Sequence, residues 1–188
     1  MKVFRTEQSY DLGPCVVALG TFDGVHIGHQ ALIRRAMELA KEMDAKCVVC
    51  TFDRHPLTLL CPERAPVPLM GMEEKLRKLA QMGVDGVLVR EFTPEFAGIE
   101  PARYLADLSR DLQVKGVVAG FNYSFGAGGR GNADLIISSA EKLGYRAEIV
   151  EAVLDGEDIV SSTLIRNLLA NGEEERAQRL MQLRSVKL

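Results

Sequence analysis

Two histidines three positions apart lie in a stretch whose residue types suit phosphate binding. The sequence GTFDGVHIGH, residues 20–29, places Gly28 between His26 and His29, where an apolar run ends and a helical pattern begins. The start of a helix carries unpaired N–H groups and about half a positive charge, and both attract phosphate. Gly28 has no side chain to keep a ligand away from the backbone. We therefore expect this loop to bind the phosphates of a nucleoside triphosphate.

The two histidines of this loop are candidates for direct contact with those phosphates. An isolated histidine would more simply be a surface or helix-capping residue, but two of the chain's three histidines fall here. We expect His26 and His29 to hold phosphate oxygens and to stabilise charge in a transition state. Asp23 has two interpretations that stay open: it orders the loop by accepting from backbone N–H groups, or it contacts the ligand.

A second polar stretch, VSSTLIR, residues 160–166, lies near the other end of the chain. If Ser162 caps a helix, Thr163 lies in its first turn and Arg166 one turn further, on a shared face. Hydroxyls, free N–H groups and a guanidinium then meet at one helix end. Alone, the stretch would equally fit a capped surface helix. Together with the histidine loop it predicts a second phosphate site, to which Ser161 also belongs.

Two further loops combine aromatic, glycine and polar residues. The sequence FNYSFGAGGRGN, residues 121–132, places Tyr123 and Phe125 among four glycines, and the sequence TFDRHP, residues 51–56, contains the third histidine, His55. Aromatic rings can stack on a planar ligand or fill a core, and both interpretations remain open here. The glycines allow a loop to fold closely around a ligand.

The elements that must position these loops follow from the hydrophobic pattern. Short apolar runs alternate with amphipathic helical segments, of which the one after the histidines places Leu32, Ala36 and Leu39 on one face. This alternation predicts an α/β fold with a five-stranded parallel sheet. Strands are expected at 15–20, 46–52, 86–90, 116–120 and 145–150, and the later helices at 72–82, from 101 to about 112, 133–143, 162–170 and 173–183. Ligands of such folds lie beyond the carboxyl ends of the strands, where the loops after the first, second and fourth strands should converge.

Composition narrows the class of protein. A chain of 188 residues is expected to form one domain, and a net charge of −3 argues against a general nucleic-acid-binding surface. No apolar run reaches the length of a membrane span, and the first residues lack the apolar core of a signal peptide. We expect a cytoplasmic protein with small-molecule ligands and neither a nucleic-acid nor a membrane partner.

The cysteines invite a metal or redox interpretation that the pattern disfavours. Cys47 and Cys50 have the C-x-x-C spacing, but they lie in the apolar run KCVVCTF. Residues three apart on a strand point to opposite faces of the sheet and cannot easily hold one ion. We expect buried structural thiols.

Taken together, these motifs resemble one family. F-D-G-V-H-I-G-H, T-F-D-R-H-P, F-N-Y-S-F-G and S-S-T-L-I-R occur in this order and cover roughly residues 14–183. They resemble the adenylyltransferase module of the prokaryotic bifunctional riboflavin kinase/FMN adenylyltransferases, which belong to the HxGH nucleotidyltransferase superfamily. The resemblance implies a Rossmann-like, doubly wound sheet and one such domain over 1–188. The riboflavin kinase domain that usually follows in this family is expected to be absent from this chain, and two interpretations stay open: a stand-alone adenylyltransferase, or a fragment of a bifunctional protein.

The resemblance further implies a reaction and a set of site residues. The reaction transfers AMP from ATP to FMN and gives FAD and pyrophosphate, with Mg²⁺ accompanying ATP. His26, His29 and Arg166 would be catalytic. The ATP site would comprise Gly20, Thr21, Phe22, Asp23, Gly28, Asn122, Ser161, Ser162 and Thr163, and the flavin site Phe52, His55, Pro56, Tyr123, Phe125 and Arg130. No metal ligand is assigned.

Two other functions fit part of the pattern. The loop G-T-F-D-x-x-H-x-G-H also resembles that of cytidylyltransferases, which are members of the same superfamily. The second alternative is a protein that binds flavin or nucleotide without turning it over. The stretches S-S-T-L-I-R and F-N-Y-S-F-G disfavour the cytidylyltransferase, and the intact H-x-G-H and S-S-T-L-I-R disfavour the non-enzyme. The sequence does not predict an oligomeric state.

Overall fold

A computed structural model describes residues 1–5 and 11–183 of the protein. Its centre is a parallel sheet of six strands in the order β1-β4-β3-β2-β5-β6. The strands are β1 (Lys2–Arg5), β2 (Cys15–Leu19), β3 (Lys46–Phe52), β4 (Gly86–Arg90), β5 (Val114–Gly120) and β6 (Arg146–Val150). After β4 the chain crosses to the other side of β2, so the strand order reverses between β2 and β5. This reversal makes the sheet doubly wound, as predicted, and creates the crevice where such folds bind ligands.

The expected number of strands, five, is wrong by one. The additional strand is β1, which pairs in parallel with β4 in the register Val3↔Val87. Only Phe4 among its four residues is buried. An edge strand this short has no run of apolar residues, because one of its edges and most of its surface face solvent. Its pairing with β4 is a tertiary contact that periodicity does not encode.

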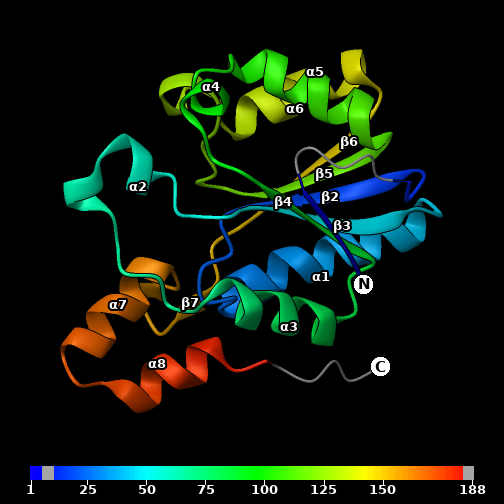
Figure 1. Ribbon diagram of the computed structural model, residues 1–188. Helices are drawn as coiled ribbons and strands as arrows, with labels where there is room; N and C mark the ends of the chain where they lie inside the picture. The colour runs from blue at the N-terminus through cyan, green and yellow to red at the C-terminus, as the bar shows by residue number, and fades with distance from the viewer. Residues whose placement is uncertain (6–10, 184–188) are drawn as a thin grey trace.

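Helices cover both faces of the sheet (Figure 1). Helices α1 (Ile27–Glu42) and α3 (Met72–Met82) lie on one face, and α5 (Pro101–Leu112) and α6 (Ala133–Leu143) lie on the other. The predicted helices are confirmed to within a residue or two at most ends. Two short helices, α2 (Leu57–Leu60) and α4 (Pro94–Ala97), and the hairpin of β7 (Leu154–Asp155) with β8 (Asp158–Ile159) were not predicted.

The core consists of two apolar layers separated by the sheet. All five residues of β2 are buried; Val17 and Leu19 face α5 and α6, and Val16 and Ala18 face α1 and α3. A parallel strand covered on both faces reads as a continuous apolar run, which is why the pattern identified it.

The two cysteines of the C-x-x-C spacing lie on opposite faces of the sheet. Cys47 packs in the layer of α1 and α3, and Cys50 packs in the layer of α5 and α6. Both are free and buried, as is Cys15. The expectation of structural thiols is therefore confirmed.

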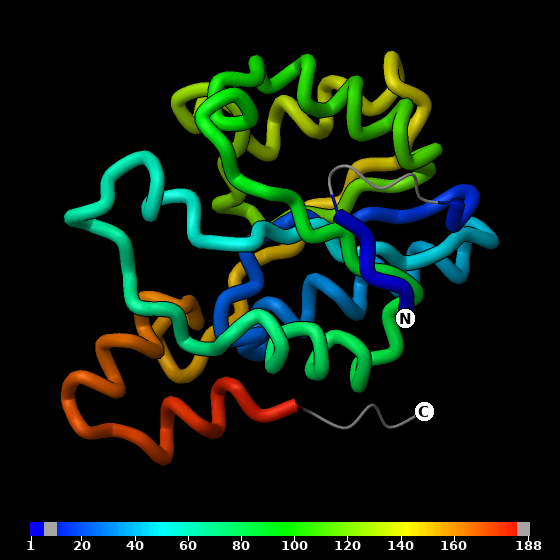
Figure 2. Tube along the Cα trace, in the orientation of Figure 1, coloured from blue at the N-terminus to red at the C-terminus, as the bar shows by residue number. Residues whose placement is uncertain are grey.

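A third, smaller cluster attaches the last two helices, α7 (Ser162–Ala170) and α8 (Glu174–Met181), to the rest of the fold. Ile165 and Leu168 of α7 and Leu180 of α8 pack with Ile27, the first residue of α1. Figure 2 shows this orange and red hairpin beside the start of α1, at the carboxyl edge of the sheet. Within residues 1–5 and 11–183, no helix is both long and apolar enough to cross a membrane.

The burial of the thiols predicts their reactivity. Burial raises the pKa of Cys47 and of Cys50 to about 12 and also raises that of Cys15, whereas Cys61 is partly exposed. We expect a chromogenic disulfide reagent to modify only Cys61 in the native protein, and slowly, because its contact with Glu63 raises the thiol pKa. All four cysteines should react in denaturant. Rapid modification of a second thiol under native conditions would contradict the described core.

Candidate active site

A cavity of about 550 Å³ lies at the carboxyl edge of the sheet, above the reversal between β2 and β5. Its wall includes the loops after β2, β3 and β5, which are the three loops expected to converge, together with the start of α7 and residues that follow β4 and β6. All but three of the predicted site residues line it: His26, His29, Arg166, Gly20, Thr21, Gly28, Asn122, Ser161, Ser162, Thr163, Phe52, His55, Pro56, Tyr123 and Phe125. The fold thus brings together residues from both ends of the chain.

His26 combines a structural and a cavity-lining position. It is the N-cap of α1, where its Nδ1 accepts from the backbone N–H of His29 at 3.3 Å. Its side chain is 4% exposed, and burial lowers its pKa to about 4. The imidazole is therefore neutral at pH 7, and the accepting Nδ1 leaves the proton on Nε2. His26 is therefore a helix-capping residue through its Nδ1, as one interpretation expected, and its ring also lines the cavity.

His29 stacks on His26 with 3.6 Å between the ring centroids. Burial lowers its pKa well below the usual value, and the neighbouring His26 and Lys75 lower it further. Its Nδ1 is buried and has no hydrogen-bond partner among the described residues. An unpaired buried polar atom is costly. The residue His29 also lines the cavity.

Asp23 connects the histidine loop to the second polar stretch. One carboxylate oxygen accepts from the guanidinium of Arg166, 143 positions further along, and the other accepts from the backbone N–H of Leu69 at 2.9 Å. The backbone carbonyl of Asp23 accepts from the hydroxyl of Ser162 at 2.9 Å. Arg166 also donates from Nε to the carbonyl of Val67 at 2.8 Å. Of the two interpretations of Asp23, the first describes its contacts: its carboxylate accepts from a backbone N–H and orders the loop. Its partners Leu69 and Arg166 lie far away in the sequence.

Two small details show how closely the two segments approach. A Cβ atom on Gly28 would lie 3.2 Å from the ring of His26 and 3.4 Å from the carbonyl oxygen of Val160. The N-cap of α7 is Ser161, whose hydroxyl oxygen accepts from the N–H of Leu164 at 3.1 Å. The assumption that Ser162 is the cap is therefore wrong, because its hydroxyl donates to Asp23 instead. The positive end of α7 still opens on the cavity, which Ser161, Ser162 and Thr163 line.

The opposite wall of the cavity is aromatic. Phe52 meets Phe92 and Phe96 edge-on at centroid distances of 5.2 and 5.6 Å, and Phe96 meets Tyr104 at 5.8 Å. Tyr123 and Phe125 are stacked at 5.5 Å, and Phe125 is also part of the core. These rings form a surface suited to a planar ligand. Phe92, Phe96 and Tyr104 were not predicted for the site, because they follow the third expected strand, whose loop carried no polar motif.

Three predicted site residues do not line the cavity. Phe22 is fully buried in the core between the sheet and α1, with its ring edge-on to His29 at 5.2 Å. Asp23 lies behind the loop in the contacts described above. Arg130 is exposed and bound to the carboxylate of Glu100 at 2.6 Å and to the carbonyl of Ala127 at 3.0 Å. Their assignment as ligand contacts stays a prediction.

Lys75 of α3 is a polar residue of this region that the sequence analysis missed. It is 8% exposed, and its Nζ donates to the carbonyl of Thr21 in the histidine loop at 2.8 Å. The signal was present but ambiguous, since Lys75 lies one turn after Met72 on the face that buries Leu79. Among the residues that the structure describes, no three His, Cys, Asp or Glu side chains gather to hold a metal ion.

The fold and the cavity define the class of protein. The layers, the doubly wound sheet and the helix starts at the crevice are those of a Rossmann-like α/β protein of the nucleotidyltransferase type. A family model described as FAD synthetase matches residues 8–164. The chain belongs to this family.

Curated relatives carry related names. A bifunctional riboflavin kinase/FMN adenylyltransferase of Listeria monocytogenes is 38% identical over 167 residues, which are 88% of this chain and 53% of that protein. The protein of the same name from Escherichia coli K12 is 33% identical, over 96% of this chain and 59% of that protein. A putative protein of this name from Geobacillus thermodenitrificans is 32% identical over 96% and 97% of the two chains. The chain thus spans a little over half the length of the first two relatives.

Solved structures agree on the fold. A crystal structure described as a macrolide-efflux protein from Streptococcus pneumoniae has a TM-score of 0.85 and 30% identity, over 96% of this chain and 60% of that one. A pantoate-beta-alanine ligase from Francisella tularensis has a TM-score of 0.55 at 14% identity, over 94% and 74% of the two chains, and this likeness shows the fold alone.

The low pKa of His26 predicts an acid-dependent loss of stability. Because the folded protein binds a proton on this ring only near pH 4 and the unfolded chain does so near 6.5, the stabilisation is complete above pH 6.5 and is lost as the pH falls toward 4. Between pH 7.5 and 5 this one group should remove roughly 2 kcal/mol from the free energy of unfolding. Urea unfolding of the wild type and of His26→Asn, which keeps an N-cap, measures the difference. Equal pH dependence in both proteins would contradict it.

The ion pair of Asp23 and Arg166 should couple strongly in a double-mutant cycle. Both side chains are mostly buried, so Asp23→Ala should cost about 3 kcal/mol of unfolding free energy. Adding Arg166→Met should recover part of this cost, with a coupling of about 1–3 kcal/mol. The exposed pair Arg103–Asp107 on α5 serves as the control, with an expected coupling of about 0.3–0.5 kcal/mol. Coupling no larger than in the control would show that the two segments are not held by this pair.

Proposed function

We propose that this chain is an FMN adenylyltransferase, which transfers AMP from ATP to FMN and releases FAD and pyrophosphate. The observation that carries the proposal is that one cavity is lined both by polar groups, namely His26, His29, Arg166 and the start of α7 (the phosphate wall), and by aromatic rings (the aromatic wall). The first suits the polyphosphate of ATP, and the second suits the flat ring system of a flavin. Membership of the FAD synthetase family supports the same assignment.

The reaction needs positioning and charge stabilisation more than a protein nucleophile. An oxygen of the FMN phosphate attacks the α-phosphorus of ATP, the bond from this phosphorus to the bridging oxygen breaks, and pyrophosphate leaves with the electron pair. The attacking phosphate is already anionic, so no side chain has to remove a proton from it. Negative charge grows on the bridging oxygen, and donors fixed in advance around the phosphates stabilise that charge.

The donors on the phosphate wall have distinct roles in the proposal. The neutral rings of His26 and His29 donate hydrogen bonds to phosphate oxygens, and the approach of a polyphosphate favours their protonated forms. Arg166 adds a permanent positive charge that Asp23 and the carbonyl of Val67 hold in place. The start of α7, with Ser161, Ser162 and Thr163, supplies N–H groups and hydroxyls; Gly20, Thr21, Gly28 and Asn122 complete the ATP side.

The flavin would lie against the aromatic wall. Phe52, His55, Pro56, Tyr123 and Phe125 come from the predicted set, and Phe92, Phe96 and Tyr104 are added by the structure. Phe52 and Phe96 lie at the centre of the edge-on ring contacts, so either ring can face the flavin without losing its neighbours.

Mg²⁺ would enter on the phosphates of ATP. In the part of the chain described, the cavity has hydroxyls, the amide of Asn122 and the carboxylate of Glu151, but no cluster of three metal-ligating side chains. This set fits an ion that keeps several waters and is held mainly by substrate phosphates. When bound, the ion neutralises phosphate charge. We place the reaction in the cytoplasm, where ATP and FMN are its only required partners.

The proposal is tested by incubating the purified chain with ATP, FMN and Mg²⁺ and separating FAD by chromatography, with pyrophosphate measured in a coupled assay. Riboflavin in place of FMN should give no product, because it lacks the attacking phosphate. CTP with a small phosphorylated alcohol tests the cytidylyltransferase alternative. Absence of FAD from folded protein, or tight FMN binding with no pyrophosphate release, would reject the proposal.

Replacement of His29 should separate catalysis from folding. We expect His29→Asn to lower kcat for FAD formation by about 10²–10³-fold, because a fixed donor to the phosphates is lost. The protein should remain folded, because the replacement removes two ring contacts, with His26 and with Phe22, worth about 0.5–1.5 kcal/mol each, and no hydrogen bond of Nδ1.

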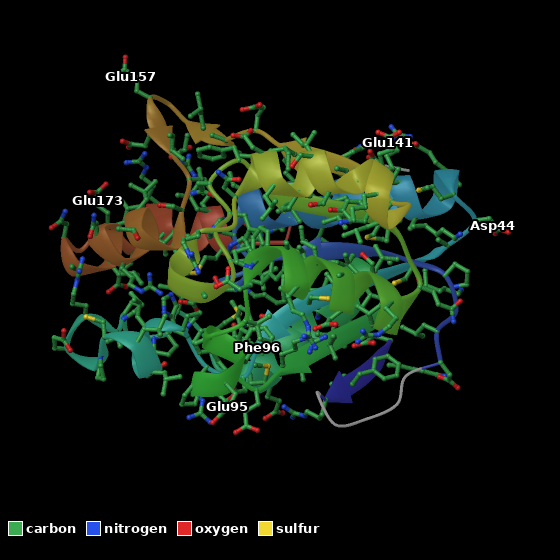
Figure 3. All side chains as sticks on the ribbon, turned by 90° about the horizontal axis from the view of Figure 1, so that it is seen from above. Asp44, Glu95, Phe96, Glu141, Glu157 and Glu173 are labelled. Carbon is green, nitrogen blue, oxygen red and sulfur yellow. The ribbon has the colours of Figure 1, made fainter. Side chains whose placement is uncertain are left out.

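The control for this replacement is Glu141→Gln on α6, at the end of the molecule opposite Glu157 and Glu173 (Figure 3). It should leave both the turnover and the unfolding free energy unchanged. Turnover of His29→Asn within twofold of the wild type would remove His29 from the catalytic set.

A further inference from the structure

Lys75 is a buried lysine that the reaction described above does not use. It lies on α3 beside the fully buried Leu79, and only 8% of it is exposed. Lysine is almost never buried unless it is paired, because an ammonium loses its hydration there. Within residues 1–5 and 11–183, no carboxylate lies close enough to Lys75 to form an ion pair. Burial lowers the pKa of Lys75, and the charge of Asp23 partly offsets this effect. An apolar side chain would fill this position at lower cost.

The ammonium of Lys75 is directed at one backbone carbonyl of the histidine loop. Its Nζ lies 2.8 Å from the oxygen of Thr21 and 3.5 Å from Oγ1 of Thr51. The hydroxyl of Thr51, at the end of β3, donates to the same carbonyl at 2.9 Å. The carbonyl of Thr21 would repel phosphate oxygens if it turned into the cavity. The hydrogen bonds from Lys75 and Thr51 hold this carbonyl away from the phosphates.

The loop needs such ties because its backbone is strained. Phe22 and Val25, on either side of Asp23, have φ values of 50° and 43°, in the left-handed region that side chains other than glycine rarely occupy. Strained conformations persist only where surrounding contacts impose them. Asp23 ties the loop on one side through Arg166 and Leu69, and Lys75 ties it on the other through Thr21.

The charge of Lys75 also acts across the loop. It lowers the pKa of His29 and of His55, two of the histidines that line the cavity. Lys75 itself does not line the cavity, so its charge reaches the ligand space from behind Thr21. The charge of Lys75 therefore acts on the phosphate wall, while the Lys75 side chain occupies none of the space for the ligand.

We propose that Lys75 is a positioning residue for adenylyl transfer, which holds the Thr21 carbonyl away from the phosphates and places a fixed positive charge behind the phosphate wall. This inference rests on the proposed function. An apolar residue at position 75 would stabilise the fold more than a buried lysine does, so stability alone does not account for Lys75.

The test compares Lys75→Met, Lys75→Arg and Lys78→Met with the wild type. Lys78 is the matched control, because it lies one turn along the same helix and also donates to a backbone carbonyl, that of Met181 at 3.0 Å. We expect Lys75→Met to lower kcat by about 10–100-fold, as misplaced reacting groups do, while KM for FMN changes less than about twofold. The melting temperature of Lys75→Met should be equal to or higher than that of the wild type.

A second readout follows the charge itself. The ring C–H signals of the three histidines can be titrated by NMR in each variant. Loss of the nearby positive charge makes protonation easier, so Lys75→Met should raise the pKa of His55, while Lys78→Met should not change it. Lys75→Arg, which keeps both a donor and the charge, should restore the pKa and part of the turnover.

Each outcome tests either the proposed function or the role of Lys75. A wild type that makes no FAD rejects the proposed function, and the role of Lys75 in turnover with it. A wild type that is active, together with a folded Lys75→Met of unchanged kcat, rejects the role of Lys75 alone. If Lys75→Met does not fold, Lys75→Gln replaces it; a folded Lys75→Gln with wild-type kcat, or failure of both to fold, shows that Lys75 is structural.

Discussion

The site depends on one buried ion pair between residues from opposite ends of the chain. Asp23 lies in the loop after the first central strand, and Arg166 lies on the last but one helix. The two segments lie 143 positions apart, so long-range contacts hold them together: this pair, and the packing of Ile27 against Ile165. The pair, with the hydrogen bond from Ser162 to the Asp23 carbonyl, fixes where α7 starts relative to α1. Both helix starts can then act on one ligand.

The polar part of the cavity wall combines Arg166 and the start of α7 with Lys75, which lies behind Thr21. Burial lowers the pKa of both histidines, and His26 and Lys75 lower that of His29 further. The basic side chains Arg166 and Lys75 each donate to a backbone carbonyl of a neighbouring segment. Donors held in this way need little rearrangement when charge develops on a ligand, which is the condition for electrostatic catalysis.

The sequence predicted the elements that carry strong local signals. The strands β2, β3, β4 and β5 contain apolar runs, the helices have apolar faces, and the histidine and serine stretches have the composition of anion sites. The expected strand β6 is confirmed as well, although it is an edge strand with no buried residue. It did not predict β1, whose existence depends on pairing with β4, or that Ser161 rather than Ser162 caps α7, since neighbouring serines are equivalent until their partners are known. Lys75 and Phe96 were missed for the same reason: their roles come from what lies opposite them in space.

The α7–α8 hairpin has its own small core, distinct from the two layers around the sheet. Among the described residues, its contacts with the start of the chain's central layer are few: Ile27 in its core, the pair of Arg166 with Asp23, and the hydrogen bond from Gln30 to the carbonyl of Gln182. A unit attached in this way can open while the sheet remains folded, and opening it would separate Arg166 from the histidines. A ligand that contacts both Arg166 and the histidines would stabilise the closed position of the hairpin. Ligand binding would therefore increase the order of α7 and α8.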